Sequence, residues 1–229
     1  MIEAIIFDCD GVLVNSEELG IEVERRWLAS IGLHYEQEEF AARFLGLTDV
    51  DFMEAIGSDR RRRMGLDLPP DFFAGLNREK LDVFRRKLCA IEGVGSFVRA
   101  LSVPVAVASS SGMDFLVEKL EWTGLRHLFA PNIFSADQVA RGKPHPDLFL
   151  HAARRIGCSP SRCVVLEDSE NGVRAGVAAE MTVWGFLGGR SDRLGMRLRQ
   201  AGAAEIFADY GTVRGHYAAM TTAADSSAG

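Results

Sequence analysis

The chain opens with an apolar run, Ala4-Ile5-Ile6-Phe7, that ends in the polar sequence Asp8-Cys9-Asp10-Gly11. Short apolar runs bounded by turn residues are typical of buried strands. Further runs of this kind predict strands at 103–108, 132–135, 163–166, 181–184 and 205–208. Because helical patterns separate these runs beyond residue 91, the alternation predicts a parallel sheet with right-handed crossovers.

Residues 16–88 carry a different pattern, without β-rich runs. Leu19, Val23 and Trp27 recur at helical spacing over 16–31, and Ser16 is a suitable cap for this helix. More helices are expected at 36–45, 50–64 and 70–88, and beyond the insert near 115–122, at 148–156 and at 171–179. We therefore predict an α/β protein with a Rossmann-like, three-layer core over 1–14 and 89–229. A small all-helical domain is inserted at 15–88, and the tail after Val213 is expected to end loosely.

Composition narrows the range of partners. The 229 residues are 47% hydrophobic and 25% charged, with a formal net charge of −6. Nucleic-acid-binding proteins usually carry a basic surface, so this balance argues against such a role but not against a phosphorylated substrate. The four cysteines form no CxxC pair, and no apolar stretch is long enough to span a bilayer. We expect reduced thiols, no membrane partner and a cytoplasmic location.

Polar side chains follow the predicted strands at the points where ligands bind in open α/β sheets. They are Asp8 and Asp10, Ser109, and Glu167 with Asp168, and a rigid Gly-Lys-Pro-His-Pro loop adds Lys143. Carboxylate oxygens without histidine or cysteine suit Mg²⁺, and a lysine suits a phosphate group. This set has the parts of a phosphoryl-transfer site: a nucleophile, a cation, fixed donors and an acid.

These four motifs, in this order, resemble those of haloacid dehalogenase superfamily hydrolases of the phosphatase and phosphomutase branch, whose helical cap matches the insert. The resemblance implies that Asp8 is the nucleophile and forms an aspartyl-phosphate. Asp10 would act as acid and base, and its backbone carbonyl would bind Mg²⁺. Ser109 and Lys143 would hold the phosphoryl oxygens. Asp8 and Asp168 would complete the metal site. Glu167 would either bind the metal directly or support a residue that binds it.

The aspartate at position 10 favours phosphate esters, because haloalkanoate dehalogenases of this superfamily lack it. A β-phosphoglucomutase-type phosphomutase is the alternative, and a non-catalytic binding protein is a weaker one. Where the mutase has a histidine, this chain has Gly20. Where the mutase has a Lys-Gly pair followed by an arginine, this chain has Leu45-Gly46 and Asp49. These differences count against mutase activity. The complete motif set counts against a non-catalytic protein.

The substrate is expected to be a small phosphorylated metabolite. The opening motif and the stretch at 90–94 resemble the sugar-phosphate phosphatases, which implies a sugar phosphate or sugar-acid phosphate such as 6-phosphogluconate. Arg43 is either a substrate contact or a solvated helix residue. The run of arginines at 60–63 is more typical of a solvated helix face than of a patch that attracts anionic substrates. Trp27, Phe40 and Phe44 are expected to pack the insert's own core. We expect a monomer or a weak homo-oligomer.

Overall fold

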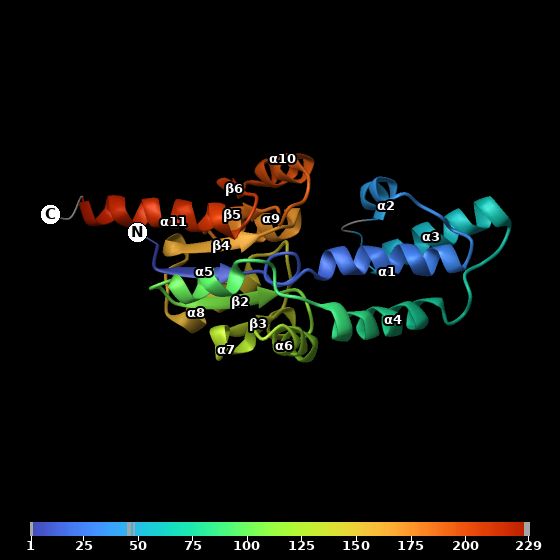
Figure 1. Ribbon diagram of the computed structural model, residues 1–229, viewed down its shortest axis with the longest axis horizontal. Helices are drawn as coiled ribbons and strands as arrows, with labels where there is room; N and C mark the ends of the chain where they lie inside the picture. Colours follow the sequence, from blue (N-terminus) through green and yellow to red (C-terminus); the bar gives the residue numbers. More distant parts are fainter. Residues whose placement is uncertain (1, 45–46, 48, 227–229) are drawn as a thin grey trace. The chain divides into compact units, whose positions relative to one another are not determined.

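The computed structural model describes residues 2–44, 47 and 49–226. The chain divides into two compact units, one made of Met1–Asn15 with Cys89–Gly229 and the other of Ser16–Leu88 (Figure 1).

The first unit is built on a parallel sheet of six strands in the order β3-β2-β1-β4-β5-β6. The strands are β1 (Ala4–Phe7), β2 (Val105–Ser109), β3 (Ile133–Ser135), β4 (Cys163–Glu167), β5 (Thr182–Phe186) and β6 (Glu205–Phe207). The continuous apolar runs reflect burial on both faces of a parallel sheet. This arrangement confirms the predicted α/β fold.

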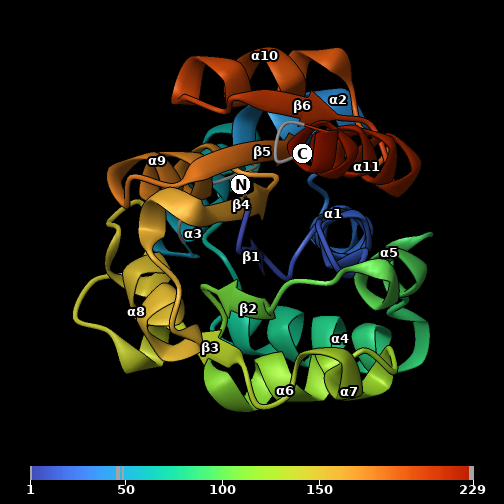
Figure 2. The same cartoon turned by 90° about the vertical axis from the view of Figure 1, so that its left-hand side faces the viewer.

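Helices cover both faces of the sheet, so the unit has three layers. They are α5 (Val94–Ala100), α6 (Met113–Trp122), α7 (Arg126–Phe129), α8 (Asp147–Ile156), α9 (Glu170–Ala178), α10 (Asp192–Ala201) and α11 (Tyr210–Ser226). In Figure 2, α8 and α9 lie on one side of the sheet, and α5 and α11 lie on the other.

The central strand β1 supplies side chains to both layers of the core, because successive strand residues point to opposite faces. Ile6 belongs to an apolar cluster that includes Leu148 and Phe149 of α8. Phe7 packs edge-on against Phe97 of α5 and Phe129 of α7, at centroid distances of 6.2 and 5.6 Å. All residues of β1 are fully buried, so the strand fixes the position of the polar residues that follow it.

The C-terminal segment is helical in α11 as far as Ser226. The end of the tail, which is expected to be loose, lies outside the described residues at 227–229. Val213 and Tyr217, one helical turn apart, are buried, and Tyr217 packs against Phe97. Tertiary packing therefore orders a segment whose Ala-, Thr- and Gly-rich composition gives little helical signal.

The second unit is helical throughout its described residues, as predicted. It consists of α1 (Ser16–Ser30), α2 (Gln37–Phe44), α3 (Asp49–Met64) and α4 (Phe72–Lys87). Trp27 of α1 packs against Phe72 of α4, and a Cβ at Gly75 would lie 2.5 Å from the Trp27 ring. Phe40 and Phe44 are buried, and their rings pack in a tilted arrangement with a centroid distance of 5.1 Å. These aromatic side chains pack the core of the insert, as predicted.

The first unit holds the two ends of the insert together. Asn15 donates its backbone N–H to the carbonyl of Cys89 at 3.1 Å, and its side chain accepts the N–H of Cys89 at 2.9 Å. Val14 also forms an antiparallel bridge with Ala90. The chain thus leaves and re-enters the first unit at one place.

Among the described residues, no helix combines the length and the apolar character needed to cross a membrane. The four cysteines form no disulfide, and Cys9 and Cys163 are buried.

Candidate active site

The site lies where β1 and β4 end, side by side at the centre of the sheet. The N–H of Asp8 donates to the carbonyl of Leu166 at 2.9 Å, and Phe7 pairs with Leu166 in register. The chain builds the sheet outward from β1 to β3 and then returns to place β4 on the other side of β1. Ligands bind beside such a switch in strand order. Asp8, Glu167 and Asp168 are all buried here.

Lys143 connects two of these carboxylates. Its Nζ lies 2.5 Å from Oδ1 of Asp8 and 2.7 Å from Oε1 of Glu167, and its side chain is 4% exposed. The Nζ also lies 4.8 Å from the ring centroid of Phe149 on α8. Burial opposes the charged form, but Asp8 and Glu167 raise the pKa of Lys143 above its usual value. A fixed positive charge therefore lies between two acidic groups.

The environment of Asp8 strongly perturbs its carboxyl group. Burial raises its pKa to about 7, Lys143 opposes that rise, and the negative charges of Glu167 and Asp10 add to it. A strongly shifted carboxyl group in a polar cluster is typical of functional sites. Any further cation beside Asp8 would favour its charged, nucleophilic form.

Glu167 is held by donors on both oxygens. Oε1 accepts from Lys143, while Oε2 accepts the backbone N–H groups of Asp168 and Ser169, each at 2.9 Å. The Ser169 hydroxyl donates to the same Oε2 at 3.0 Å and caps α9 by accepting the N–H of Gly172. The position of Glu167 is therefore set by the first turn of α9.

The three carboxylates can hold a metal ion. Ligand oxygens of Asp8, Glu167 and Asp168 lie within 4.8 Å of one another. An all-oxygen, acidic donor set suits a divalent cation such as Mg²⁺. The family resemblance assigns the backbone carbonyl of Asp10 to the metal, and the Asp10 carboxylate is not in this group. The donor set fits the metal that the sequence predicts.

Asp168 also contacts a residue that sequence reasoning missed. Arg190, after β5, lies with Nη1 2.8 Å from Oδ2 of Asp168, and its Nη2 donates to the carbonyl of Gly11 at 3.2 Å. Gly11 has a φ of +71°, and a Cβ there would lie 1.9 Å from the same Oδ2. The glycine of the first motif therefore allows both the turn and the close approach of Asp168.

Ser109 and Asp10 lie on the β2 side of the site. Ser109 is buried at the end of β2, and its Oγ accepts the N–H of Ser111 at 3.1 Å. It is not a helix cap, because α6 begins later, with Gly112 in the cap position. Asp10 contacts Ser111 and Lys119, neither of which sequence reasoning placed in the site. The only indication in the sequence was the position of Lys119 within the apolar face of the helix predicted near 115–122.

Arg43 is half-buried, with its side chain 33% exposed, and its ion pairs and ring contacts lie within the helical unit. Its Nη2 lies 2.6 Å from Oδ2 of the buried Asp59, and its guanidinium stacks over Tyr35 at 5.2 Å from the ring centroid. Asp59 also pairs with Arg62 at 2.6 Å, and Arg61 pairs with Asp67 at 3.1 Å. The side chains of the arginine run are largely exposed, as expected for a solvated helix face.

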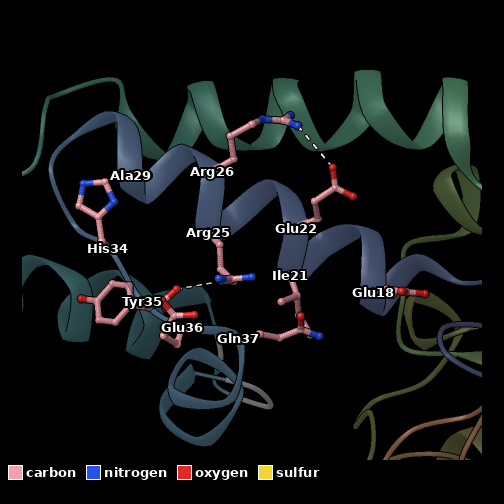
Figure 3. Close-up of a pocket in the computed structure, with 10 residues that line it drawn as sticks. All are labelled: Glu18, Ile21, Glu22, Arg25, Arg26, Ala29, His34, Tyr35, Glu36 and Gln37. Atoms are coloured by element: carbon pink, nitrogen blue, oxygen red, sulfur yellow. Dashed lines mark hydrogen bonds and ion pairs between the residues drawn. The ribbon is translucent and has the colours of Figure 1, made fainter.

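The helical unit has a cavity of about 480 Å³ of its own (Figure 3). Figure 3 shows Arg25 on α1 donating to the backbone carbonyl of Tyr35, with Glu22 and Arg26 paired nearby on the same helix. Its lining mixes acidic and basic side chains and contains none of the residues predicted to be catalytic. Leu45 and Gly46, the predicted departures from a mutase loop, lie outside the described residues.

Comparison with known proteins agrees with this geometry. The model of the haloacid dehalogenase-like hydrolase family matches residues 5–186, and the chain belongs to this family. It is 29% identical over 186 residues to 6-phosphogluconate phosphatase of Escherichia coli K12, covering 81% of this chain and 82% of that protein. It is 31% identical over 208 residues to the phosphorylated carbohydrates phosphatase of Thermotoga maritima, covering 89% and 93%.

Among solved structures, a haloacid dehalogenase family hydrolase from Deinococcus radiodurans with bound phosphate and sodium superposes with a TM-score of 0.84. It is 35% identical in sequence, and the match covers 95% of each chain. The prediction that this chain is a hydrolase of this family, in the branch whose curated relatives are phosphatases, is confirmed.

Proposed function

We propose that this protein is a Mg²⁺-dependent phosphatase that hydrolyses a small phosphomonoester, a sugar phosphate or a sugar-acid phosphate such as 6-phosphogluconate. The observation that carries the proposal is the buried cluster in which Lys143 lies within 2.7 Å of both Asp8 and Glu167, beside Asp168. Relatives that act on 6-phosphogluconate and on phosphorylated carbohydrates support the substrate class.

Asp8 is the nucleophile in this proposal. One of its carboxylate oxygens attacks phosphorus and displaces the sugar alkoxide, which takes a proton from Asp10. Asp10 then removes a proton from water, and the resulting hydroxide attacks the aspartyl-phosphate, which releases inorganic phosphate and restores Asp8. Lys143 and the Ser109 hydroxyl hold the phosphoryl oxygens during both transfers.

The metal site in this proposal is formed by Asp8 and Asp168. Because protein donors already engage both oxygens of Glu167, we assign Glu167 the role of orienting Lys143 and the strand end rather than direct coordination. When bound, Mg²⁺ neutralises charge on the phosphoryl oxygens. The family resemblance adds the backbone carbonyl of Asp10 as a further metal ligand in this proposal.

We also propose that residues Ser16–Leu88 act as a cap that excludes water from the site during the reaction. The protein would act in the cytoplasm on a small metabolite, as a monomer or a weak homo-oligomer.

The test is phosphate release from a panel of sugar phosphates and sugar-acid phosphates, with Mg²⁺ and with a chelator. Asp8→Asn should abolish release while the circular dichroism spectrum stays unchanged, and the chelator should abolish release by the wild type. Asp192→Asn, an exposed carboxylate on α10, is the matched control and should retain full activity. Phosphate release by Asp8→Asn at the wild-type rate would refute the nucleophile. Conversion of β-glucose 1-phosphate to glucose 6-phosphate without release of inorganic phosphate would favour a mutase.

A further inference from the structure

Lys119 is a buried lysine on the inward face of α6. Its side chain is 1% exposed, and it shares the buried face of the helix with Leu116 and Leu120. Lysine is almost never fully buried unless its charge is paired, because taking an ammonium group out of water is costly. The groups that pair with Lys119 therefore show what it is placed to do.

All three hydrogens of the Lys119 ammonium group have acceptors in the structure. Nζ lies 2.6 Å from each carboxylate oxygen of Asp10 and 2.8 Å from the Ser111 hydroxyl oxygen. The Ser111 hydroxyl in turn donates to Oδ2 of Asp10 at 3.0 Å. The Asp10 carboxylate is thus held from α6 and from the segment between β2 and α6.

Ser111 is itself tied to the end of the sheet. Its N–H donates to the Ser109 hydroxyl at 3.1 Å, and its carbonyl accepts the Ser135 hydroxyl at 2.7 Å. The aliphatic part of Lys119 runs along the apolar core, and its Nζ lies 5.0 Å from the ring centroid of Phe115. The charge of Lys119 is paired with the Asp10 carboxylate, whose side chain is 33% exposed.

We infer that Lys119 is a positioning residue that, with Ser111, fixes the orientation of the Asp10 carboxylate for proton transfer to the leaving group and from water. This inference rests on the proposed function, in which Asp10 is the acid and base. Proton transfer depends on a donor held at hydrogen-bond distance in the right direction, and groups locked by a supporting shell provide that. A purely structural ion pair would instead join α6 to the strand end and have no selective effect on chemistry.

The two roles differ in how they depend on the leaving group. A sugar alkoxide needs a proton as it leaves, whereas p-nitrophenolate is stable enough to leave without one. Lys119→Met keeps an unbranched side chain of similar length in the apolar core but removes the charge. We expect its kcat/KM to fall at least about tenfold more for the best sugar phosphate than for p-nitrophenyl phosphate, a part of the typical 10²–10⁴-fold contribution of an acid.

Two further variants make the test specific. Ser111→Ala should shift the ratio of the two kcat/KM values in the same direction but less, because Lys119 still contacts both oxygens of Asp10. Glu121→Gln, which removes an exposed charge paired with Arg126 on the same helix, is the matched control and should leave the ratio unchanged. In an Asp10→Asn background, Lys119→Met should have little further effect on either substrate, since the two residues act as a unit.

Three results would count against the inference. An equal loss of kcat/KM for both substrates, or a full effect of Lys119→Met in the Asp10→Asn background, would show that Lys119 has only a structural role. A crystal structure of Lys119→Met with Asp10 in its original orientation would overturn the positioning role directly. A wild-type protein that hydrolyses neither substrate would overturn the proposed function, and this inference with it.

Discussion

Gly172, in the first turn of α9, gives a prediction in which two effects have opposite signs. Its backbone is helical, so replacement by alanine should stabilise the helix by about 0.5–1 kcal/mol through propensity alone. A Cβ at this position, however, would lie 1.6 Å from Oε1 and 1.9 Å from Cδ of Glu167. Glu167 would have to move, although its side chain is 1% exposed and held on both oxygens.

The cost of that movement is set mainly by the ion pair between Glu167 and Lys143. Breaking a buried ion pair so that a charge loses its partner costs about 3–5 kcal/mol. Lys143 keeps Asp8 as a second partner, so we take the lower end of this range, about 3 kcal/mol. After subtracting the gain in helix propensity, we expect Gly172→Ala to reduce the free energy of unfolding by about 2 kcal/mol.

The assay is urea denaturation followed by tryptophan fluorescence in a Trp27→Phe background, which leaves Trp122 and Trp184, both in the sheet-containing unit. This choice matters because two units need not unfold in one transition. Gly215→Ala in α11 is the matched control, since a Cβ there meets nothing within 4 Å and should raise stability by about 0.5–1 kcal/mol. If both variants were equally stabilised, the reasoning about Glu167 would be wrong.

Two more predictions concern other parts of the chain. Burial raises the pKa of Asp59, but hydrogen bonds from Tyr35 and Arg43 outweigh it, so the pKa lies below its usual value. The stabilisation from Asp59 is therefore complete above about pH 4 and is lost as the pH falls through the lowered pKa. Asp59→Asn should reduce stability by about 1–2 kcal/mol at pH 7, and by less in acid, as measured by thermal unfolding of the wild type and the variant. Burial raises the pKa of the Cys9 thiol, so in native protein a thiol reagent should label exposed Cys89 first, and mass spectrometry showing equal labelling would contradict this.

Much of the site was predictable because its residues follow strands whose apolar runs are unmistakable. Asp8, Glu167 and Asp168 occupy the ends of β1 and β4, and parallel pairing brings those ends together regardless of the details of packing. Lys143 was found because its loop carries a recognisable motif, although its distances to Asp8 and Glu167 depend on how that loop folds back. The roles of these residues remain predictions.

Lys119 and Arg190 could not be found in the same way. Each reaches the site through a long side chain from an element far away in the sequence, and a lysine on a helix is far more often solvated than buried. The helices α10 and α11 were missed for a related reason. Charged residues dominate α10 and small residues dominate α11. Packing against the sheet unit, through the buried Leu198 of α10 and through Tyr217 of α11 on Phe97, accompanies their helical structure.

The central position of β1 has a consequence for the order of folding. This strand is made first, yet its partners β2 and β4 begin at Val105 and Cys163, so its hydrogen bonds on one side wait for most of the chain to be synthesised. Until then a fully apolar strand has no neighbours, and unpaired strands of this kind promote aggregation. The insert that follows makes mainly local helical contacts, which form quickly. We therefore expect a folding intermediate during synthesis in which the helices of Ser16–Leu88 are formed while β1 is still unpaired.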